Sequence, residues 1–584
     1  MVAAVPQTKE SAQDLAQKRL SMQVAGIADE TTTIRSLDWD RDRFDIEFGL
    51  QNGTTYNSFI IRGEKTALVD TSHAKFRELY MDALKGELDL AEIDYIVVSH
   101  TEPDHSGLIK DVLDLAPNAV VVGAKVAITF LEDLIHAPFE RQVVKNGDTL
   151  DLGNGHVLEF TNAPNLHWPD TIFTYDHKTG ILYTCDAFGA HFCTDNLFDE
   201  DLEALSPDFH FYYECLMAPN ARSVISAMKR MDKIDGEIET IATGHGPLLR
   251  HNVAELTGRY REWSQQKSDA ETLIAVFYVS DYGYSDRISQ AIARGITKTG
   301  VGVEMVDLRS TDAQDVNEIV SRSTGVVIGM PPSTGRGYEE THAALGTILA
   351  GVDSKKTFGL FESYGGDDEP IDPLHTKLQD LGLKIAFDPI RIKDTPGEAV
   401  YQLCEETGTD LGQELAQSKK IKKIKALDAD LQKALGRISS GLYIITATKG
   451  NVRSAMLASW ITQASFEPLG FTVAVAKDRA IESLMQVGDT FVLNILEEGN
   501  HLPLMKHFLK RFPPGADRFA GVRTRPANNK SPILADALAY LECEVASRME
   551  LSDHWLVYCT VDNGKVSKEE AQTAVHHRKV GNYY

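Results

Sequence analysis

Residues 96–107 read Ile-Val-Val-Ser-His-Thr-Glu-Pro-Asp-His-Ser-Gly and give the clearest chemical signal in the chain. The apolar, β-branched run at 96–98 predicts a buried strand, and the polar residues after it predict a loop. Within six positions this loop carries four side chains that bind metals: His100, Glu102, Asp104 and His105. Imidazole nitrogen and carboxylate oxygen are common ligands of first-row transition metals, and a loop beside a buried strand can hold them rigidly. The stretch therefore predicts a metal site.

The spacing H-x-E-x-D-H resembles the metal loop of the metallo-β-lactamase fold, whose hydrolase members have a histidine where this chain has Glu102. Zinc hydrolases favour nitrogen ligands. A carboxylate adds a hard donor and negative charge, which suit iron that cycles between Fe(II) and Fe(III). The flavodiiron proteins show this substitution. The resemblance therefore implies a redox di-iron site rather than a hydrolytic di-zinc site.

Length and composition limit the class of protein. A chain of 584 residues predicts about three domains, and its net charge of −26 argues against binding to nucleic acid. No apolar stretch approaches the length needed for a membrane span, and the polar N-terminal tail, residues 1–30, is unlike a secretory signal. The six cysteines form no CxxC pair, so we expect reduced thiols and a cytoplasmic protein.

The first domain, residues 31–265, alternates short strand-like runs (58–61 and 66–69) with helical patterns such as 74–85, which suits an αββα sandwich. The flavodiiron resemblance implies the remaining ligands, which are His167, Asp186 and His245. It assigns one iron to His100, Glu102 and His167, and the other to Asp104, His105 and His245, with Asp186 as the bridge. Trp168 and His191 are expected either to orient ligands or only to pack around them.

The second domain, residues 270–412, begins with a buried-strand run at 272–279 that leads into an amphipathic helix at 287–298. The loop between them offers backbone N–H groups to a phosphate. Two further strands, 325–329 and 357–361, also end in polar loops, and the set resembles the flavodoxin fold, a doubly wound parallel sheet that binds FMN. The residues implied at the FMN are Ser280, Asp281, Tyr282, Gly283, Tyr284, Ser285, Pro332, Ser333, Thr334, Ser363, Tyr364, Gly365 and Gly366.

Residues 413–430 form a lysine-rich segment, which we interpret as a linker helix or as a dock for an acidic electron donor. Residues 431–584 then resemble the split β-barrel of NAD(P)H:flavin oxidoreductases, through the stretches 434–447, 454–465 and 491–496. That resemblance implies a second flavin, FMN or FAD, on which the nicotinamide of NAD(P)H stacks. The residues nominated for this flavin are Ser459, Thr462, Ser465 and Arg479.

The order of the three domains is similar to that of the flavodiiron proteins of oxygenic phototrophs. This similarity implies four-electron reduction of O₂ to water, in protection of photosynthetic electron transport, with NAD(P)H or a ferredoxin-like protein as the donor. It also implies a head-to-tail dimer or larger oligomer, made of identical or related flavodiiron subunits. Reduction of NO at the same irons, a zinc hydrolase with regulatory flavin domains, and an inert electron carrier or scaffold remain alternatives.

Overall fold

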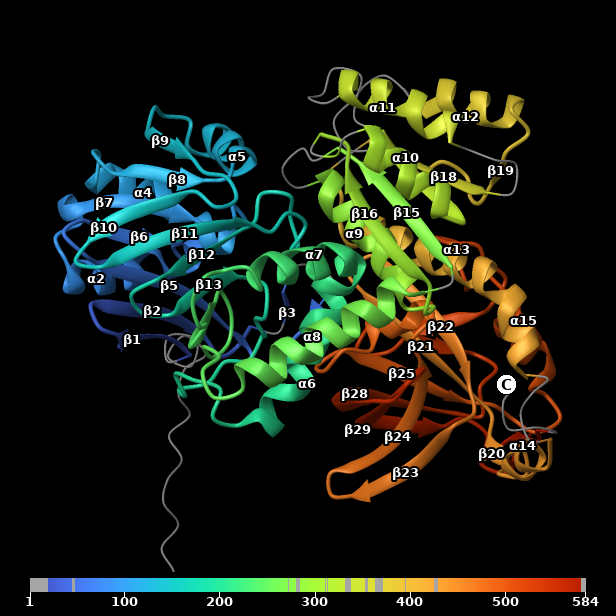
Figure 1. Ribbon diagram of the computed structural model, residues 1–584. Helices are drawn as coiled ribbons and strands as arrows, with labels where there is room; N and C mark the ends of the chain where they lie inside the picture. The colour runs from blue at the N-terminus through green and yellow to red at the C-terminus, as the bar shows by residue number, and fades with distance from the viewer. Residues whose placement is uncertain are drawn as a thin grey trace, which may run out of the picture. The chain divides into compact units, whose positions relative to one another are not determined.

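The computed structural model forms two compact units, one containing residues 19–41 and 50–269 and the other containing residues 270–584 (Figure 1). We describe each unit separately. The structure describes residues 19–41, 43–44, 48–270, 272–279, 284–309, 311, 313–330, 338–351, 356–362, 371–393, 395–424 and 429–578.

Two sheets form the centre of the first unit. The seven-stranded sheet has the order β1 (Leu20–Ala28), β2 (Thr31–Asp38), β5 (Thr54–Arg62), β6 (Thr66–Val69), β7 (Ile93–Val98), β8 (Val120–Gly123), β9 (Glu140–Val143). The five-stranded sheet has the order β10 (Thr149–Gly153), β11 (His156–Asn162), β12 (Ile172–Asp176), β13 (Ile181–Cys185), β14 (Thr240–Thr243). Apolar side chains of both sheets, among them Phe59 and Phe160, are buried in one cluster, because the sheets pack face to face.

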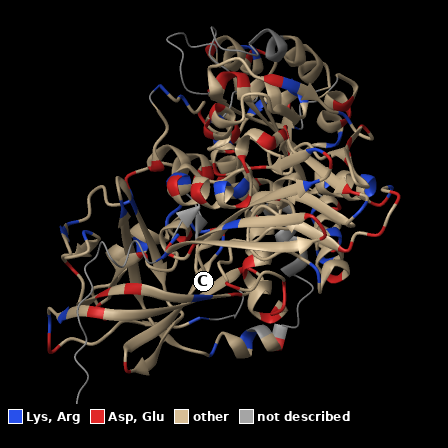
Figure 2. Cartoon of the chain, turned by 90° about the vertical axis from the view of Figure 1, so that its left-hand side faces the viewer, with Lys and Arg blue, Asp and Glu red and all other residues tan. Residues whose placement is uncertain are grey.

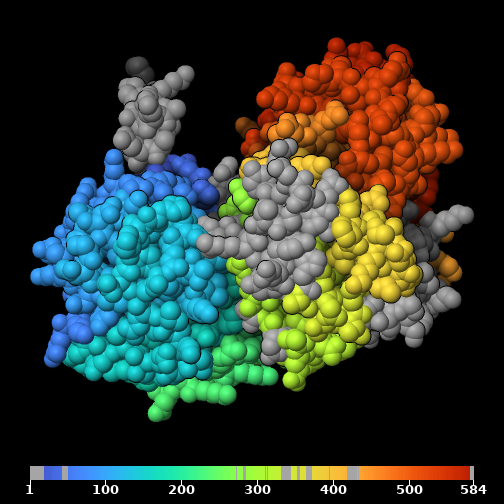
Figure 3. Space-filling model, turned by 90° about the horizontal axis from the view of Figure 1, so that it is seen from above, coloured from blue at the N-terminus to red at the C-terminus, as the bar shows by residue number. Residues whose placement is uncertain are grey.

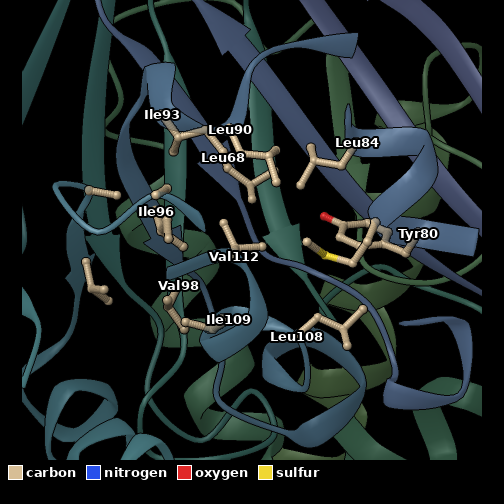
Figure 4. Close-up of a cluster of buried hydrophobic side chains, with 14 of the residues drawn as sticks. Leu68, Tyr80, Leu84, Leu90, Ile93, Ile96, Val98, Leu108, Ile109 and Val112 are labelled. Atoms are coloured by element: carbon tan, nitrogen blue, oxygen red, sulfur yellow. The ribbon is translucent and has the colours of Figure 1, made fainter. Parts of the chain in front are cut away.

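Helices cover the outer faces of this sandwich. Alternate residues of β7 face away from the other sheet, and Ile96 and Val98 pack there against Leu84 of α2 (Arg77–Glu87) and Val112 of α4 (Ile109–Leu115), as Figure 4 shows. Three further helices follow later in the unit: α6 (Leu202–Tyr212), α7 (Ala221–Met231) and α8 (Val253–Ser268). The predicted αββα architecture is confirmed.

The prediction of an N-terminal tail over residues 1–30 is wrong for the last part of that range. There Leu20–Ala28 forms strand β1, which pairs antiparallel with β2. Its apolar residues alternate with polar ones, and Leu20 and Met22 pack against the core of the sandwich. Alternation of this kind buries one face of an edge strand, which outweighs the polar average of the segment. Residues 1–18 lie outside the described residues.

The second unit begins with a five-stranded, all-parallel sheet. Its order is β16 (Gly302–Asp307), β15 (Leu273–Tyr278), β17 (Gly325–Met330), β18 (Thr357–Glu362), β19 (Lys384–Ile385), which is the flavodoxin-like order 2-1-3-4-5. Helices α9 (Tyr284–Thr297), α10 (Ala313–Arg322), α11 (Tyr338–Ala350), α12 (Ile371–Asp380) and α13 (Glu398–Ile424) accompany it. Buried apolar clusters line both faces of the sheet, as a doubly wound fold requires.

Helices α9 and α13 approach each other very closely. A Cβ atom added at Gly295 would lie 2.0 Å from the carbonyl oxygen of Glu405, and one added at Gly408 would lie 2.0 Å from that of Ile292. The two glycines therefore allow backbone-to-backbone packing that any larger residue would prevent. Because α13 extends to Ile424, it includes residues 413–424 of the segment that we predicted as a linker at 413–430.

The rest of the second unit is a seven-stranded antiparallel sheet. Its order is β22 (Val452–Ala458), β21 (Tyr443–Lys449), β25 (Thr490–Ile495), β28 (Ala539–Glu550), β29 (His554–Val566), β24 (Leu469–Ala476), β23 (Ile461–Phe466). Its residues, orange to red in Figure 3, enclose a core that includes Val473, Phe491 and Cys543. This is the reductase-like domain that the sequence predicts.

Acidic and basic residues are interspersed along the helices and strands (Figure 2). A search of the described helices finds none with the length and apolar character that crossing a bilayer requires. All six cysteines are free thiols.

Candidate metal centre

The predicted ligands come from loops that follow strands of both sheets in the first unit. Strand β7 ends two residues before His100, and the short helix α3 (Pro103–Ser106) carries Asp104 and His105. His167 lies in the connection between β11 and β12, Asp186 directly follows β13, and His245 follows β14. The sandwich therefore brings to one place side chains that are far apart in the sequence.

The first group of ligands contains His100, Glu102, His167 and Asp186, all of them buried. Nε2 of His167 lies 3.0 Å from Oε2 of Glu102, and Nε2 of His100 lies 3.3 Å from the same oxygen. Both of these nitrogens lie 3.5 Å from Oδ2 of Asp186. Their donor atoms therefore converge on a volume suited to one metal ion.

The second group contains Asp104, His105 and His245, which are also buried. Nε2 of His245 lies 3.2 Å from Oδ2 of Asp104 and 3.3 Å from Oδ1 of Asp186. Nε2 of His105 lies 3.1 Å from the same oxygen of Asp186. Since Oδ2 of Asp186 faces the first group and Oδ1 faces the second, this carboxylate stands between them as a bridge would.

Burial and mutual charge determine the protonation of these groups. Burial alone would lower the pKa of His167 and His245, but the neighbouring carboxylates outweigh it and raise their pKa values to about 9 and about 10. Burial would likewise raise the pKa of Glu102 and Asp186, but the charges of the histidines hold both well below their usual range. The carboxylates are therefore ionised, and metal ions must displace protons from the histidines to bind.

The polar atoms of this cluster fit a metal. Both carboxylate oxygens of Asp104 and Oδ2 of Asp186 are buried and lack a hydrogen bond of ordinary geometry. Ring nitrogens of the other predicted ligands face two of them, at 3.2 Å from Oδ2 of Asp104 and 3.5 Å from Oδ2 of Asp186. Buried carboxylate oxygens without donors are costly unless a cation neutralises them. Seven nitrogen and oxygen ligands, with a carboxylate at position 102, suit two iron ions better than two zinc ions.

Glycines on both sides of His245 make room for this arrangement. A Cβ atom at Gly244 would lie 2.7 Å from Cε1 of His105, and Gly246 has a positive φ of 78°. A side chain at position 244 would therefore displace a ligand, and one at position 246 would strain the backbone.

Asp170 and Tyr212 touch the ligands, although the sequence did not single them out. Asp170 is fully buried and accepts a hydrogen bond of 2.8 Å from Nδ1 of His100, and two more from the backbone and side chain of Thr101. The Tyr212 hydroxyl, at the end of α6, donates a hydrogen bond of 2.9 Å to Oδ1 of Asp186. Asp170 is the last residue of the Asn-Leu-His-Trp-Pro-Asp motif that contains His167, so its closeness in sequence to a predicted ligand could have indicated its role. No sequence feature indicates Tyr212, because only the packing of α6 brings it to Asp186.

His191 and Trp168, which we left open, also border the ligands. Nδ1 of His191 lies 2.8 Å from the Thr54 hydroxyl, and its ring contacts the ring of His245 with centroids 4.8 Å apart. The indole of Trp168 packs edge-on against His100, with centroids 5.1 Å apart. Both side chains therefore restrict the rotation of ligand imidazoles.

The residues nominated for FMN fall mostly where the structure is not described. Tyr284 and Ser285 are the first two residues of helix α9, the next helix after β15. Outside the described residues lie Ser280, Asp281, Tyr282, Gly283, Pro332, Ser333, Thr334, Ser363, Tyr364, Gly365 and Gly366. Their part in binding FMN stays a prediction.

In the reductase-like domain, Ser459 and Arg479 line one cavity of about 180 Å³, together with Trp460 and the α13 residue Gln413. Thr462 and Ser465 are not among its lining residues. The Ser465 hydroxyl instead makes hydrogen bonds with the carbonyl of Pro468 (2.6 Å) and the hydroxyl of Tyr558 (2.7 Å). The structure therefore gathers two of the four nominated residues at one cavity, and the part of all four in binding flavin stays a prediction.

Comparisons with known proteins agree with this architecture. Residues 54–246 match the "ODP family beta lactamase" model, residues 276–408 match "Flavodoxin", and residues 435–583 match "Flavin reductase like domain". The chain is 68% identical to "Diflavin flavoprotein A 1" of Synechocystis sp., over 97% of this chain and 99% of that protein. It is 67% identical to "Putative diflavin flavoprotein A 3" of Nostoc sp., with the same coverage. The "Metal soaked Flv1 flavodiiron core" of Synechocystis sp. is 36% identical, with a TM-score of 0.63, and the match covers 68% of this chain and 100% of that core.

Fold and site together define an oxidoreductase in which a metallo-β-lactamase-like metal centre shares one chain with two flavin-type domains. The chain belongs to the diflavin flavoproteins, which are flavodiiron proteins with a flavin reductase-like domain. Membership implies that it uses iron and flavins.

Proposed function

We propose that the protein catalyses the reaction 2 NAD(P)H + 2 H⁺ + O₂ → 2 NAD(P)⁺ + 2 H₂O in the cytoplasm, in protection of photosynthetic electron transport. The observation that carries this proposal is the convergence of seven buried ligands in two groups on either side of Asp186, with Glu102 in the position that favours iron. Two irons at this site supply electrons by cycling between Fe(II) and Fe(III).

The residues around the ligands orient them and hold a proton. Asp170 fixes the ring of His100 by accepting the hydrogen bond from Nδ1, which leaves Nε2 directed at the first metal position. Burial, and then the charge of Asp186, raise the pKa of Tyr212 well above its usual range, so its hydroxyl stays protonated at neutral pH. The Tyr212 Oη atom thus keeps a proton beside the bridging carboxylate, where reduction of O₂ consumes protons.

Electrons enter, in this proposal, at the reductase-like domain, where NAD(P)H gives a hydride to the flavin. The flavodoxin-like domain would hold FMN, which would pass electrons to the metal centre of a second subunit in a head-to-tail dimer of identical or related subunits. A ferredoxin-like donor would deliver single electrons instead. The strand order 2-1-3-4-5 supports the FMN role, because flavodoxin-like sheets bind FMN at the ends of their central strands.

One preparation can test the proposal. The iron-loaded protein is supplied with NADH, NADPH or a reduced ferredoxin-like protein, and consumption of O₂ and of NO is measured together with peroxide release. Consumption of O₂ without peroxide, lost when zinc replaces iron, is the expected result. Faster consumption of NO than of O₂ would make the enzyme an NO reductase, and full activity with zinc alone would refute a redox metal site.

A further inference from the structure

The second unit contains a buried carboxylate that joins its two domains. Glu482 lies in η5 (Ala480–Leu484) of the reductase-like domain and is 3% exposed. Its Oε2 atom lies 2.5 Å from Nζ of Lys298, which follows α9 of the flavodoxin-like domain. Its Oε1 atom lies 2.5 Å from Arg548 of β28, in its own domain. A single carboxylate therefore pairs with one cation from each domain.

Neighbouring residues of α13 extend this contact. Lys298 also pairs with Glu405. The side-chain amide of Gln402 donates a hydrogen bond of 3.0 Å to the carbonyl of Ala480 and accepts one of 2.7 Å from the Ser483 hydroxyl. The η5 segment is therefore held by ionic and neutral hydrogen bonds to one face of α13 and the end of α9. Lys298 neutralises two buried carboxylates at once. Removing its charge would leave Glu482 with Arg548 of its own domain and Glu405 with the more distant Arg294, so the ion pair of Glu482 across the two domains would be lost.

The same helix borders the cavity of the reductase-like domain. About one turn after Gln402, Glu406 makes a paired contact with the buried Arg518, at 3.1 and 3.2 Å. Further along α13, Gln413 donates a hydrogen bond of 3.0 Å to the side chain of Asp478. Both residues line the same cavity as Arg479. The contacts through η5 thus fix the reductase-like cavity against the two helices, α9 and α13, that cover the flavodoxin-like sheet.

We propose that Glu482 and Lys298 are positioning residues, which hold the reductase-like domain against the flavodoxin-like domain so that electrons pass between their two flavins. This inference rests on the proposed function. In the step concerned, NAD(P)H gives a hydride to the first flavin and becomes NAD(P)⁺. The reduced flavin would then pass both electrons and the proton to FMN, which would be reduced as the first flavin is reoxidised. Neither residue acts on NAD(P)H, O₂ or a metal.

The experiment uses the full-length protein loaded with iron and flavin. Lys298→Met keeps most of the side chain but removes the charge that reaches Glu482 from the other domain. Two activities are measured with NAD(P)H: reduction of ferricyanide, which takes electrons from the first flavin, and consumption of O₂, which needs both flavins. We expect ferricyanide reduction to stay at the wild-type rate and O₂ consumption to fall at least tenfold, because the ion pair that joins Glu482 to the flavodoxin-like domain is lost.

Three further variants make the result specific. Lys449→Met breaks a Lys–Asp pair of 2.6 Å that lies wholly inside the reductase-like domain, and it should change neither activity. Lys298→Arg should restore O₂ consumption. Glu482→Gln tests the same pair from the other side if the first variant does not fold, and hydrogen exchange at 480–484 should rise in both.

Two failures are distinguishable. Wild-type O₂ consumption by Lys298→Met and Glu482→Gln would overturn the positioning role and leave the proposed function intact. Equal loss of both activities would make the pair merely structural and would also overturn it. A wild-type protein that reduces neither ferricyanide nor O₂ with NAD(P)H would instead overturn the proposed function.

Discussion

Asp170→Asn tests how the protein orients a metal ligand. Asp170 accepts three hydrogen bonds, from Nδ1 of His100 and from the backbone N–H and hydroxyl of Thr101. Burial would raise the pKa of Asp170, but His100 and these hydrogen bonds outweigh it and lower the pKa, so the group is an anion at neutral pH. Asparagine keeps the shape of the side chain but has one acceptor oxygen, and its NH₂ group must face one of the former donors.

The expected loss can be estimated from this geometry. One hydrogen bond to a charged acceptor contributes about 1.5–3 kcal/mol, and loss of a partner of a ligand histidine weakens metal binding by roughly 10–100-fold. These two estimates agree, because a 10–100-fold change corresponds to about 1.4–2.7 kcal/mol. We therefore expect Asp170→Asn to weaken binding of iron, by that factor, at the position that we propose for His100, Glu102 and His167.

Asp176→Asn is a matched control. Asp176 is also fully buried and also accepts a hydrogen bond of 2.8 Å from Nδ1 of a buried histidine, His156, but this pair belongs to no group of metal ligands. Fe(II) affinity is measured by competition with a coloured chelator, and unfolding temperature is measured in parallel. Both variants should lose stability, and only Asp170→Asn should lose iron affinity. Equal iron affinity in the two variants would refute the orienting role of Asp170.

Four further predictions follow from other parts of the molecule. Glu102→His should raise the zinc-to-iron ratio of the purified protein, as measured by elemental analysis, and abolish O₂ reduction; an unchanged ratio would remove this residue from the ligand set. Tyr212→Phe should bind iron normally but slow O₂ consumption by roughly 10²-fold or more if the hydroxyl supplies a proton in the slow step, and a normal rate would exclude that role. Gly408→Ala should destabilise the second unit by about 1–3 kcal/mol through the clash with α9, whereas Gly258→Ala, which meets no atom within 4 Å, should be neutral or stabilising in thermal unfolding. Burial opposes the charge of Glu482, but Lys298, Arg548 and Arg294 hold its pKa well below its usual range. A lowered pKa contributes stability above the unfolded value of about 4.3, and this contribution is lost as pH falls further. Glu482→Gln should therefore flatten the acid side of a plot of unfolding free energy against pH, and an unchanged acid side would contradict the lowered pKa.

The sequence by itself determined the succession of domains and the local part of the metal centre. Strand β15 is a continuous apolar run, as are the last three residues of β7, and their burial follows from composition alone. His100, Glu102, Asp104 and His105 lie within six residues of a strand-to-loop turn, so their proximity needs no tertiary information. The identity of Glu102 is a property of the chain, and it already favoured iron over zinc.

Only the tertiary structure decided which distant groups meet. The two oxygens of Asp186 face different ligand groups because β13 and β14 are neighbours in one sheet, which brings the loops of Asp186 and His245 together. The packing of α6 places Tyr212 at the bridge, and the contact of η5 with α9 and α13 places Glu482 opposite Lys298. Such pairs depend on long-range packing, which residue spacing does not encode. For the same reason Thr462 does not line the cavity, although Trp460, two residues before it, does.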